Sequence, residues 1–459
     1  MMKNNIYEAL FYTIVCVLVL LQSFFLYDIE LSVLKYECLF FDVLAIILAY
    51  RKLKDCFHPY IVFLLIMNVI LCSRIWIEDY IDYPFAWTTF LSSYKFSGVV
   101  QCDILYMLII SFVGCSFGMY FASAQKCVRN VCESDALKSV RILSSRIMMI
   151  LLPFVIYNSY KTWEIFSEYG YLALYSAQAG IVFEPPFKHI VVIFQCVFFI
   201  YLASKPDVKD LKKYSLLFFI VSAFGLFFGS RGGLTLVLLS FLTYINLYYV
   251  KFNKKKIFVG GVIFVFLMQL VAINRSLDQD ASFSIADMNM SSSELLVEFF
   301  RQQGVSITVL GYADEMDDGS IYDVIYPITE LFMGYLDDEY GLKNKVKYSF
   351  PHKITYTVNP NMYYKGFGAG SSYIAETYSF GGVVLLLFVN IILGYFIVYS
   401  VRKYKDEFYG RFFLLIFWQQ LYFMPRGSLF GFVPIMIKWG VLCYILKKMS
   451  VYLEVKNEK

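Results

Sequence analysis

NPNMYYKGFGAGSSYIAETYSFGGVVLLLFVNIILG, residues 359–394, joins a glycine-rich polar segment to a strongly apolar one. The apolar part continues to residue 401, and residues 383–401 contain no charged side chain. A helix of about 20 apolar residues is long enough to cross a bilayer. We therefore expect residues 383–401 to span a membrane, so that this stretch marks the point where the chain passes from water into lipid.

The glycine-rich part of the stretch has features of an anion-binding loop. Gly366, Gly368 and Gly370 leave backbone N–H groups uncovered by side chains. Ser371 or Ser372 is suited to cap a helix that begins just after the loop. We therefore expect the backbone of these five residues to contribute to a binding site.

The composition of the whole chain places it among membrane proteins. Of its 459 residues, 59% are hydrophobic and only 17% are charged, which is more apolar surface than a soluble core can bury. The ten cysteines lie mostly inside or beside apolar runs, so we expect neither a disulfide framework nor a thiolate metal site. Nothing in the charge pattern suggests nucleic-acid binding.

Apolar runs recur along the chain and predict an all-α polytopic membrane protein with about 12 transmembrane helices. We expect nine helices in residues 1–273, one large extracytoplasmic loop in residues 274–379, and three helices and a tail in residues 380–459. The runs fall near residues 8–27, 31–50, 58–78, 99–124, 147–163, 188–204, 214–229, 233–250, 257–273, 380–401, 412–425 and 428–446.

The positions of lysine and arginine predict the orientation. If the N-terminus lies in the cytoplasm, most of the 40 lysine and arginine residues fall in short segments on the cytoplasmic side, as membrane proteins prefer. The C-terminus is then also cytoplasmic, and the long loop lies on the other side. This loop is acidic; its acidic clusters are typical of a solvated face, with a divalent-cation site as the alternative, although no calcium-loop spacing is present.

Three arginines stand where charge is costly. Arg231 lies in a Gly-Ser-Arg-Gly-Gly turn between two apolar runs, Arg275 follows the ninth run, and Arg426 lies between the last two runs. All three are expected on the extracytoplasmic side. Each could reach the interface or pair with loop carboxylates, but three on one side favour an anion site, because a guanidinium donates two hydrogen bonds to a phosphate and stays protonated.

Two residues near the glycine-rich loop are candidates for proton transfer. His352 lies in the long loop just before it, and an imidazole titrates near neutral pH. Glu376 stands four residues after Ser372, one more than a capping box allows, and is therefore free for another role. The other histidines, His58 and His189, begin apolar runs and are expected to be structural.

The topology, the Ser-Arg-Gly-Gly turn within residues 226–236 and the pattern G-x-G-x-G-S-S-x-I-A-E-x-Y-x-F-G-G within residues 359–395 resemble the O-antigen polysaccharide polymerases of the Wzy type. They are also distantly similar to O-antigen ligases. The chain lacks the second arginine-rich loop of some polymerases. The resemblance implies a bacterial inner-membrane enzyme that joins oligosaccharide repeat units carried on undecaprenyl diphosphate, at the periplasmic face.

Such a reaction needs a base and a cation but no metal or other cofactor. A hydroxyl of the acceptor attacks the anomeric carbon of a sugar whose leaving group is a lipid diphosphate, and the arginines can stabilise the departing charge. We expect His352 to act as the base, with Glu376 as the rival. Aromatic residues such as Tyr363 and Tyr364 can stack on sugars or form an interfacial belt.

Other functions stay open at this point. A flippase for lipid-linked oligosaccharides would also use many helices and cations, but in a central cavity between related halves, and no matching halves are visible in the sequence. An O-antigen ligase or a structural subunit is a further alternative. The expected partners are the lipid-linked donor and acceptor, membrane lipid and a chain-length regulator.

Overall fold

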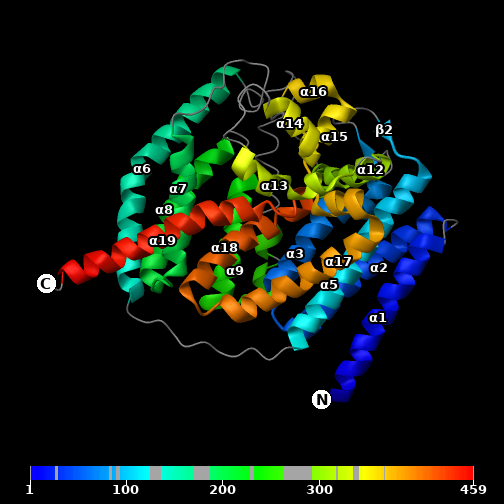
Figure 1. Ribbon diagram of the computed structural model, residues 1–459, viewed down its shortest axis with the longest axis horizontal. Helices are drawn as coiled ribbons and strands as arrows, with labels where there is room; N and C mark the ends of the chain where they lie inside the picture. Colours follow the sequence, from blue (N-terminus) through cyan, green and yellow to red (C-terminus); the bar gives the residue numbers. More distant parts are fainter. Residues whose placement is uncertain are drawn as a thin grey trace.

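The computed structural model describes the chain as an assembly of helices with one short hairpin of two strands, β1 (Trp87–Thr88) and β2 (Tyr94–Lys95) (Figure 1). The helical fold class predicted from the sequence is therefore confirmed. The structure describes residues 2–25, 29–81, 85–88, 94–124, 136–169, 187–227, 232–257, 259–262, 292–316, 319–333, 341–365 and 367–457.

Every predicted apolar run except the ninth coincides with a helix, and most of the ninth run lies outside the described residues. The helices that match these runs are α1 (Met2–Phe25), α2 (Leu31–Leu53), α3 (Pro59–Met67) with η1 (Asn68–Cys72) and α4 (Ser73–Trp76), α5 (Gly98–Ala124), α6 (Ala136–Tyr169), α7 (Lys188–Ala203), α8 (Val208–Phe227), α9 (Gly232–Tyr248), α17 (Tyr373–Tyr404), α18 (Phe408–Leu421) and α19 (Phe432–Asn457).

Within the described ranges, four helical segments are long and apolar enough to cross a membrane: Pro59–Trp76, Gly98–Ala124, Leu137–Glu168 and Tyr373–Tyr404. The shorter apolar helices among the described residues are Leu10–Phe24, His189–Ala203 and Gly232–Tyr248. The number of twelve spans and the division at residues 273 and 379 therefore stay predictions.

Helix α17 is the centre of one half of the structure, where it packs along α5. The two backbones approach so closely that a Cβ atom on Gly118 would lie 1.9 Å from the carbonyl oxygen of Ile391, and one on Gly394 would lie 2.1 Å from that of Cys115. Small residues permit such close contact between helices in membranes. The glycines of this pair therefore fix the helix that carries the quoted stretch.

The second part of the quoted stretch, from Tyr373 onward, forms the first part of α17. The helix begins at Tyr373, earlier than the apolar run, and its regular geometry is interrupted at Gly381 and Gly382, where Gly382 has a φ of 61°. Glycine adopts positive φ at little cost. The glycine pair thus separates a polar first part, residues 373–380, from the apolar part that follows.

A second layer is formed by the segment between α9 and α17. It contains α11 (Ser292–Gln303), η5 (Gly304–Ile307), α12 (Thr308–Glu315), α13 (Ile321–Met333), α14 (Gly341–Tyr348), α15 (Phe350–Val358) and α16 (Pro360–Tyr364). Figure 1 shows α12, α14, α15 and α16 together at the top of the view, over the start of α17. We call residues 292–365 the helical cap.

The cap is fixed to the bundle by buried polar contacts. The Arg74 guanidinium donates hydrogen bonds to the carbonyl oxygens of Arg301, at 3.1 Å, and of Trp87, at 2.7 Å. The Ser73 hydroxyl donates to the carbonyl oxygen of Phe300 at 2.9 Å, and Gly304 leaves no room for a Cβ atom beside Ser73. The cap is therefore an integral part of the fold.

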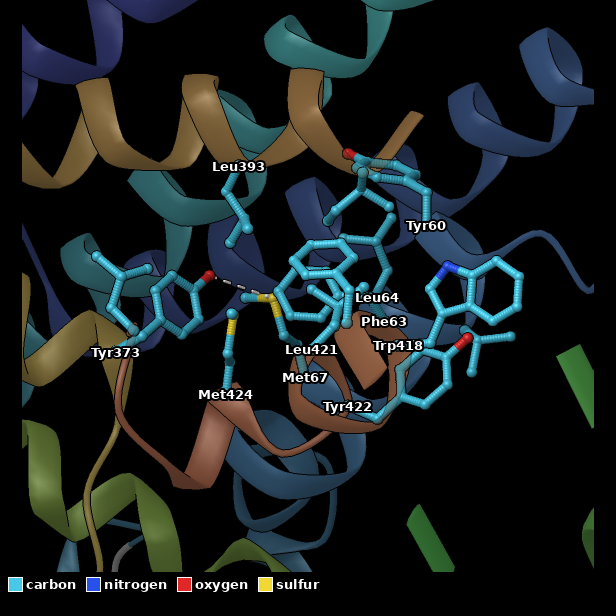
Figure 2. Packing of buried hydrophobic residues seen from close by; sticks show 14 of the residues in the cluster. Tyr60, Phe63, Leu64, Met67, Tyr373, Leu393, Trp418, Leu421, Tyr422 and Met424 are labelled. Atoms are coloured by element: carbon cyan, nitrogen blue, oxygen red, sulfur yellow. Dashed lines mark hydrogen bonds between the residues drawn. The ribbon is translucent and has the colours of Figure 1, made fainter. Parts of the chain in front are cut away.

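A buried apolar cluster supports the start of α17 and the segment after α18. In Figure 2, Tyr373 of α17 and Met424 of η6 (Met424–Arg426) lie beside Met67 of α3, and the Tyr373 hydroxyl contacts the Met67 sulfur at 3.6 Å. Both Tyr373 and Met424 are almost fully buried. Residues just before Tyr373 and just after Met424 are thus held in place by the core.

Candidate active site

A pocket of about 220 Å³ opens where the cap meets the segment after η6. Four of its residues come from one face of α13, at positions 323, 326, 327 and 330, which follow the i, i+3, i+4, i+7 spacing of a helix. The start of α15 and one residue after η6 complete the wall. The lining residues are Asp323, Tyr326, Pro327, Glu330, Ser349, Phe350, Pro351, His352 and Ser428.

His352 lies in the first turn of α15 and contributes to the pocket wall. Pro351, one residue before it, occupies an early helical position where the missing N–H costs no hydrogen bond. The Nδ1 atom of His352 lies 3.0 Å from the Tyr363 hydroxyl, and the two rings meet edge to face. Burial, and then the positive charge of Lys345, lower the pKa of His352, so the imidazole is neutral at neutral pH.

A buried ion pair, which we call the α13–α15 clamp, fixes the relative position of these two helices. The Lys353 ammonium lies 3.3 Å from an Asp323 carboxylate oxygen, and the two side chains are 12% and 0% exposed. The same oxygen accepts a hydrogen bond from the backbone N–H of Ser320 at 2.9 Å, at the start of α13. Because Lys353 follows His352 directly, the clamp also fixes the imidazole against the pocket.

Glu376 is fully buried beside the pocket and not in its wall. One carboxylate oxygen accepts a hydrogen bond from the Ser371 hydroxyl at 2.6 Å, and the other accepts one from the backbone N–H of Leu429 at 3.1 Å. The Ser428 side chain is a further hydrogen-bonding partner. Glu376 therefore joins the glycine-rich loop to the segment after η6.

The glycine-rich loop lies between α15 and Arg426. The backbone N–H of Ala369 donates a hydrogen bond to the Thr355 hydroxyl of α15 at 3.0 Å. Gly370 has a φ of 79°, and a Cβ atom there would lie 3.9 Å from both the Cγ atom and the carbonyl oxygen of Arg426. Ser372 takes the N-cap position of α17 without a side-chain cap hydrogen bond. The loop thus packs against the arginine expected to bind anions.

Arg426 ends η6 with its side chain exposed, whereas Met424 and Pro425 before it are buried. Ser428 lines the pocket with His352 and is a hydrogen-bonding partner of Glu376, and Gly370 lies beside Arg426, so the structure places these residues and the described part of the glycine-rich loop in one region. Arg231, Arg275 and Gly366 lie outside the described residues.

Some residues of this region were not singled out in the sequence. Tyr326 and Glu330 line the pocket from α13, and the helical spacing of the four α13 positions was the signal that could have identified them. From the sequence, the acidic clusters of the loop were considered a solvated face, and Asp323, which is buried in the clamp, was not singled out.

Fold and site together define a helical membrane protein with a helical cap, whose pocket has an imidazole in its wall and a guanidinium two residues from a lining serine. Such an arrangement is suited to an enzyme that acts on a polar group attached to a lipid.

The family model described as O-antigen polysaccharide polymerase Wzy matches residues 9–456, nearly the whole chain, and the chain belongs to this family. The resemblance noted in the sequence is thereby confirmed, and with it a role in O-antigen polymerisation and lipopolysaccharide biosynthesis. Neither a curated protein nor a solved structure matches the chain.

Proposed function

We propose that the protein lengthens O-antigen or capsular polysaccharide by joining oligosaccharide repeat units carried on undecaprenyl diphosphate. The reaction takes place at the periplasmic face of the bacterial inner membrane, with both termini of the chain in the cytoplasm. Membership of the polymerase family supports the general activity. The observation that carries the proposal is that His352 lines a pocket together with Ser428, two residues after Arg426.

In the proposed step, a hydroxyl oxygen of the acceptor sugar forms a bond to the anomeric carbon of the donor sugar. The bond from that carbon to the diphosphate oxygen breaks, and the diphosphate keeps the electron pair. The hydroxyl proton passes to His352. Arg426 stabilises the negative charge on the leaving diphosphate, together with Arg231 and Arg275 as predicted from the sequence.

His352 is better suited to this role than Glu376. A neutral imidazole whose Nδ1–H donates to the Tyr363 oxygen has the Nε2 lone pair available for a proton. Glu376 is fully buried, and both of its oxygens accept hydrogen bonds. We assign Glu376 to positioning: it holds the glycine-rich loop and the segment that carries Arg426.

The proposal is tested by complementing a strain that lacks the gene with single variants, and by measuring the length of the surface polysaccharide on gels. For His352→Gln and Arg426→Ala we expect product with a single repeat unit at a normal protein level, because removal of a general base slows a reaction by about 10²–10⁴. Loss of all product, including single repeats, would point to translocation. Long chains from both variants would contradict the assignment.

A further inference from the structure

The pocket beside His352 is too small for a whole oligosaccharide repeat. Pockets that enclose drug-sized ligands occupy roughly 300–1,000 Å³, whereas this one has a volume of about 220 Å³. If the proposed function is correct, the pocket therefore holds only the part of the acceptor that carries the attacking hydroxyl, which is one sugar ring.

The lining of the pocket matches the two kinds of surface that a sugar ring presents. Tyr326 and Pro327 are half-buried and give an apolar patch on α13, suited to the C–H face of a ring. Glu330 and Ser428 give polar groups suited to its hydroxyls. Tyr326 and Glu330 are four residues apart and thus share a helix face. Consistent with this, burial and then the Glu330 charge raise the pKa of Tyr326 to about 12.

The charges of the pocket predict which rings are accepted. Asp323 is compensated by Lys353 in the clamp, whereas Glu330 is exposed and forms no ion pair with any residue that the structure describes. A carboxylate accepts strong hydrogen bonds from hydroxyl groups and repels another carboxylate. The positive charge of Arg426 is two residues away in the sequence from Ser428, which lines the pocket.

We propose that this pocket is the subsite for the terminal sugar ring of the acceptor, that Glu330 recognises the hydroxyl groups of that ring, and that the ring is uncharged. The proposal rests on the function proposed above, and it assigns the two substrates to surfaces of opposite charge. The donor diphosphate binds at Arg426, and the acceptor ring binds at Glu330, with His352 in the same wall as the ring.

The test uses the full-length protein in lipid nanodiscs and pairs of probes that differ only at C6. Methyl glucoside, galactoside and mannoside are each compared with the corresponding methyl uronate, and binding is measured by saturation-transfer NMR and titration. We expect the neutral member of at least one pair to bind at least ~10-fold more tightly, as expected for loss of a charge-assisted hydrogen bond. In Glu330→Gln this ratio should fall to about 1.

Glu294→Gln is the matched control, because Glu294 is an exposed carboxylate of the cap outside the pocket lining; it should keep the wild-type ratio. Equal or tighter binding of every uronate, an unchanged ratio in Glu330→Gln, or no saturable binding of any probe would overturn the subsite. His352→Gln separates the two proposals. If this variant loses polymerisation but binds the sugar probes as the wild type does, the result agrees with the proposed base and with the proposed subsite. If it still polymerises, the result contradicts the proposed base, and the subsite is then judged from the binding data alone.

Discussion

The role of Glu376 is decided by comparing two substitutions. In Glu376→Ala, the Ser371 hydroxyl and the Leu429 N–H lose their acceptor in a fully buried place. Each unsatisfied buried group costs about 1–3 kcal/mol, so the total is about 2–6 kcal/mol. Removal of the buried carboxylate itself offsets part of this cost. We therefore expect a clearly lower thermal stability and a displaced Arg426 segment.

Glu376→Gln has the same shape and is expected to keep both hydrogen bonds. The amide oxygen can accept from the Leu429 N–H, which can only donate, while the amide NH₂ donates to the Ser371 oxygen, because a hydroxyl can rotate to accept. The expected loss of stability is about 1 kcal/mol or less. Polymerisation should then stay within about tenfold of the wild-type rate, since a positioning group needs its shape and hydrogen bonds and not a titratable proton.

The assay combines thermal unfolding in detergent with polymerisation of a lipid-linked repeat unit by the purified protein. When a carboxylate that acts as a general base is replaced by its amide, the reaction slows by about 10²–10⁴. The positioning role is refuted if Glu376→Gln unfolds at the wild-type temperature but loses activity by this factor while His352→Gln stays active.

Three further predictions concern the imidazole, the clamp and the loop. As the proposed base, His352 must be neutral, so activity should fall as pH decreases through the pKa of its imidazole. Removal of the positive charge in Lys345→Met should raise that pKa, and the acid limb of the pH–rate profile should then move to higher pH. An unmoved acid limb would contradict this. Asp323→Asn removes the charge of one partner of the buried α13–α15 clamp and should lower the free energy of unfolding by about 3–5 kcal/mol, measured by denaturation in detergent; a change below about 1 kcal/mol would show that the clamp does not hold the helices. Gly370→Ala should lower the free energy of unfolding by about 1–2 kcal/mol in the same denaturation assay, because Gly370 has a left-handed backbone conformation although there is space for a Cβ atom. Gly368→Ala is the control, because Gly368 has no positive φ. An equal loss of stability at both positions would contradict the reasoning.

The apolar helices were predictable from sequence because each coincides with an apolar run, whereas helices α12 to α16 of the cap were not predicted. His352 was chosen as a candidate because it lies before the glycine-rich loop, and Glu376 because of its distance from Ser372 in the sequence. Their surroundings were not predictable, because they depend on contacts between distant segments: Leu429 donates to Glu376, and Tyr363 contacts His352. No local pattern reports such pairs.

The long loop shows the same limit of prediction from sequence. Its acidic residues look alike in sequence, although Asp323 is buried in an ion pair and Glu330 is exposed in the pocket. The difference arises only when α13 packs against its neighbours. No helix was predicted from the sequence at α13, which contains Pro327 in its interior.

The glycine pair at Gly381 and Gly382 divides α17 into two helical segments with a kink between them. A continuous helix would transmit any tilt of its lipid-embedded part directly to Glu376, since tilting is how a helix adapts to bilayer thickness. With the interruption at this glycine pair, residues 373–380 take their direction from the cap and from the buried cluster, whereas the part that follows takes its direction from α5, against which it packs closely. We therefore expect a change in the tilt of the α5–α17 pair to be absorbed at this glycine pair before it reaches Glu376.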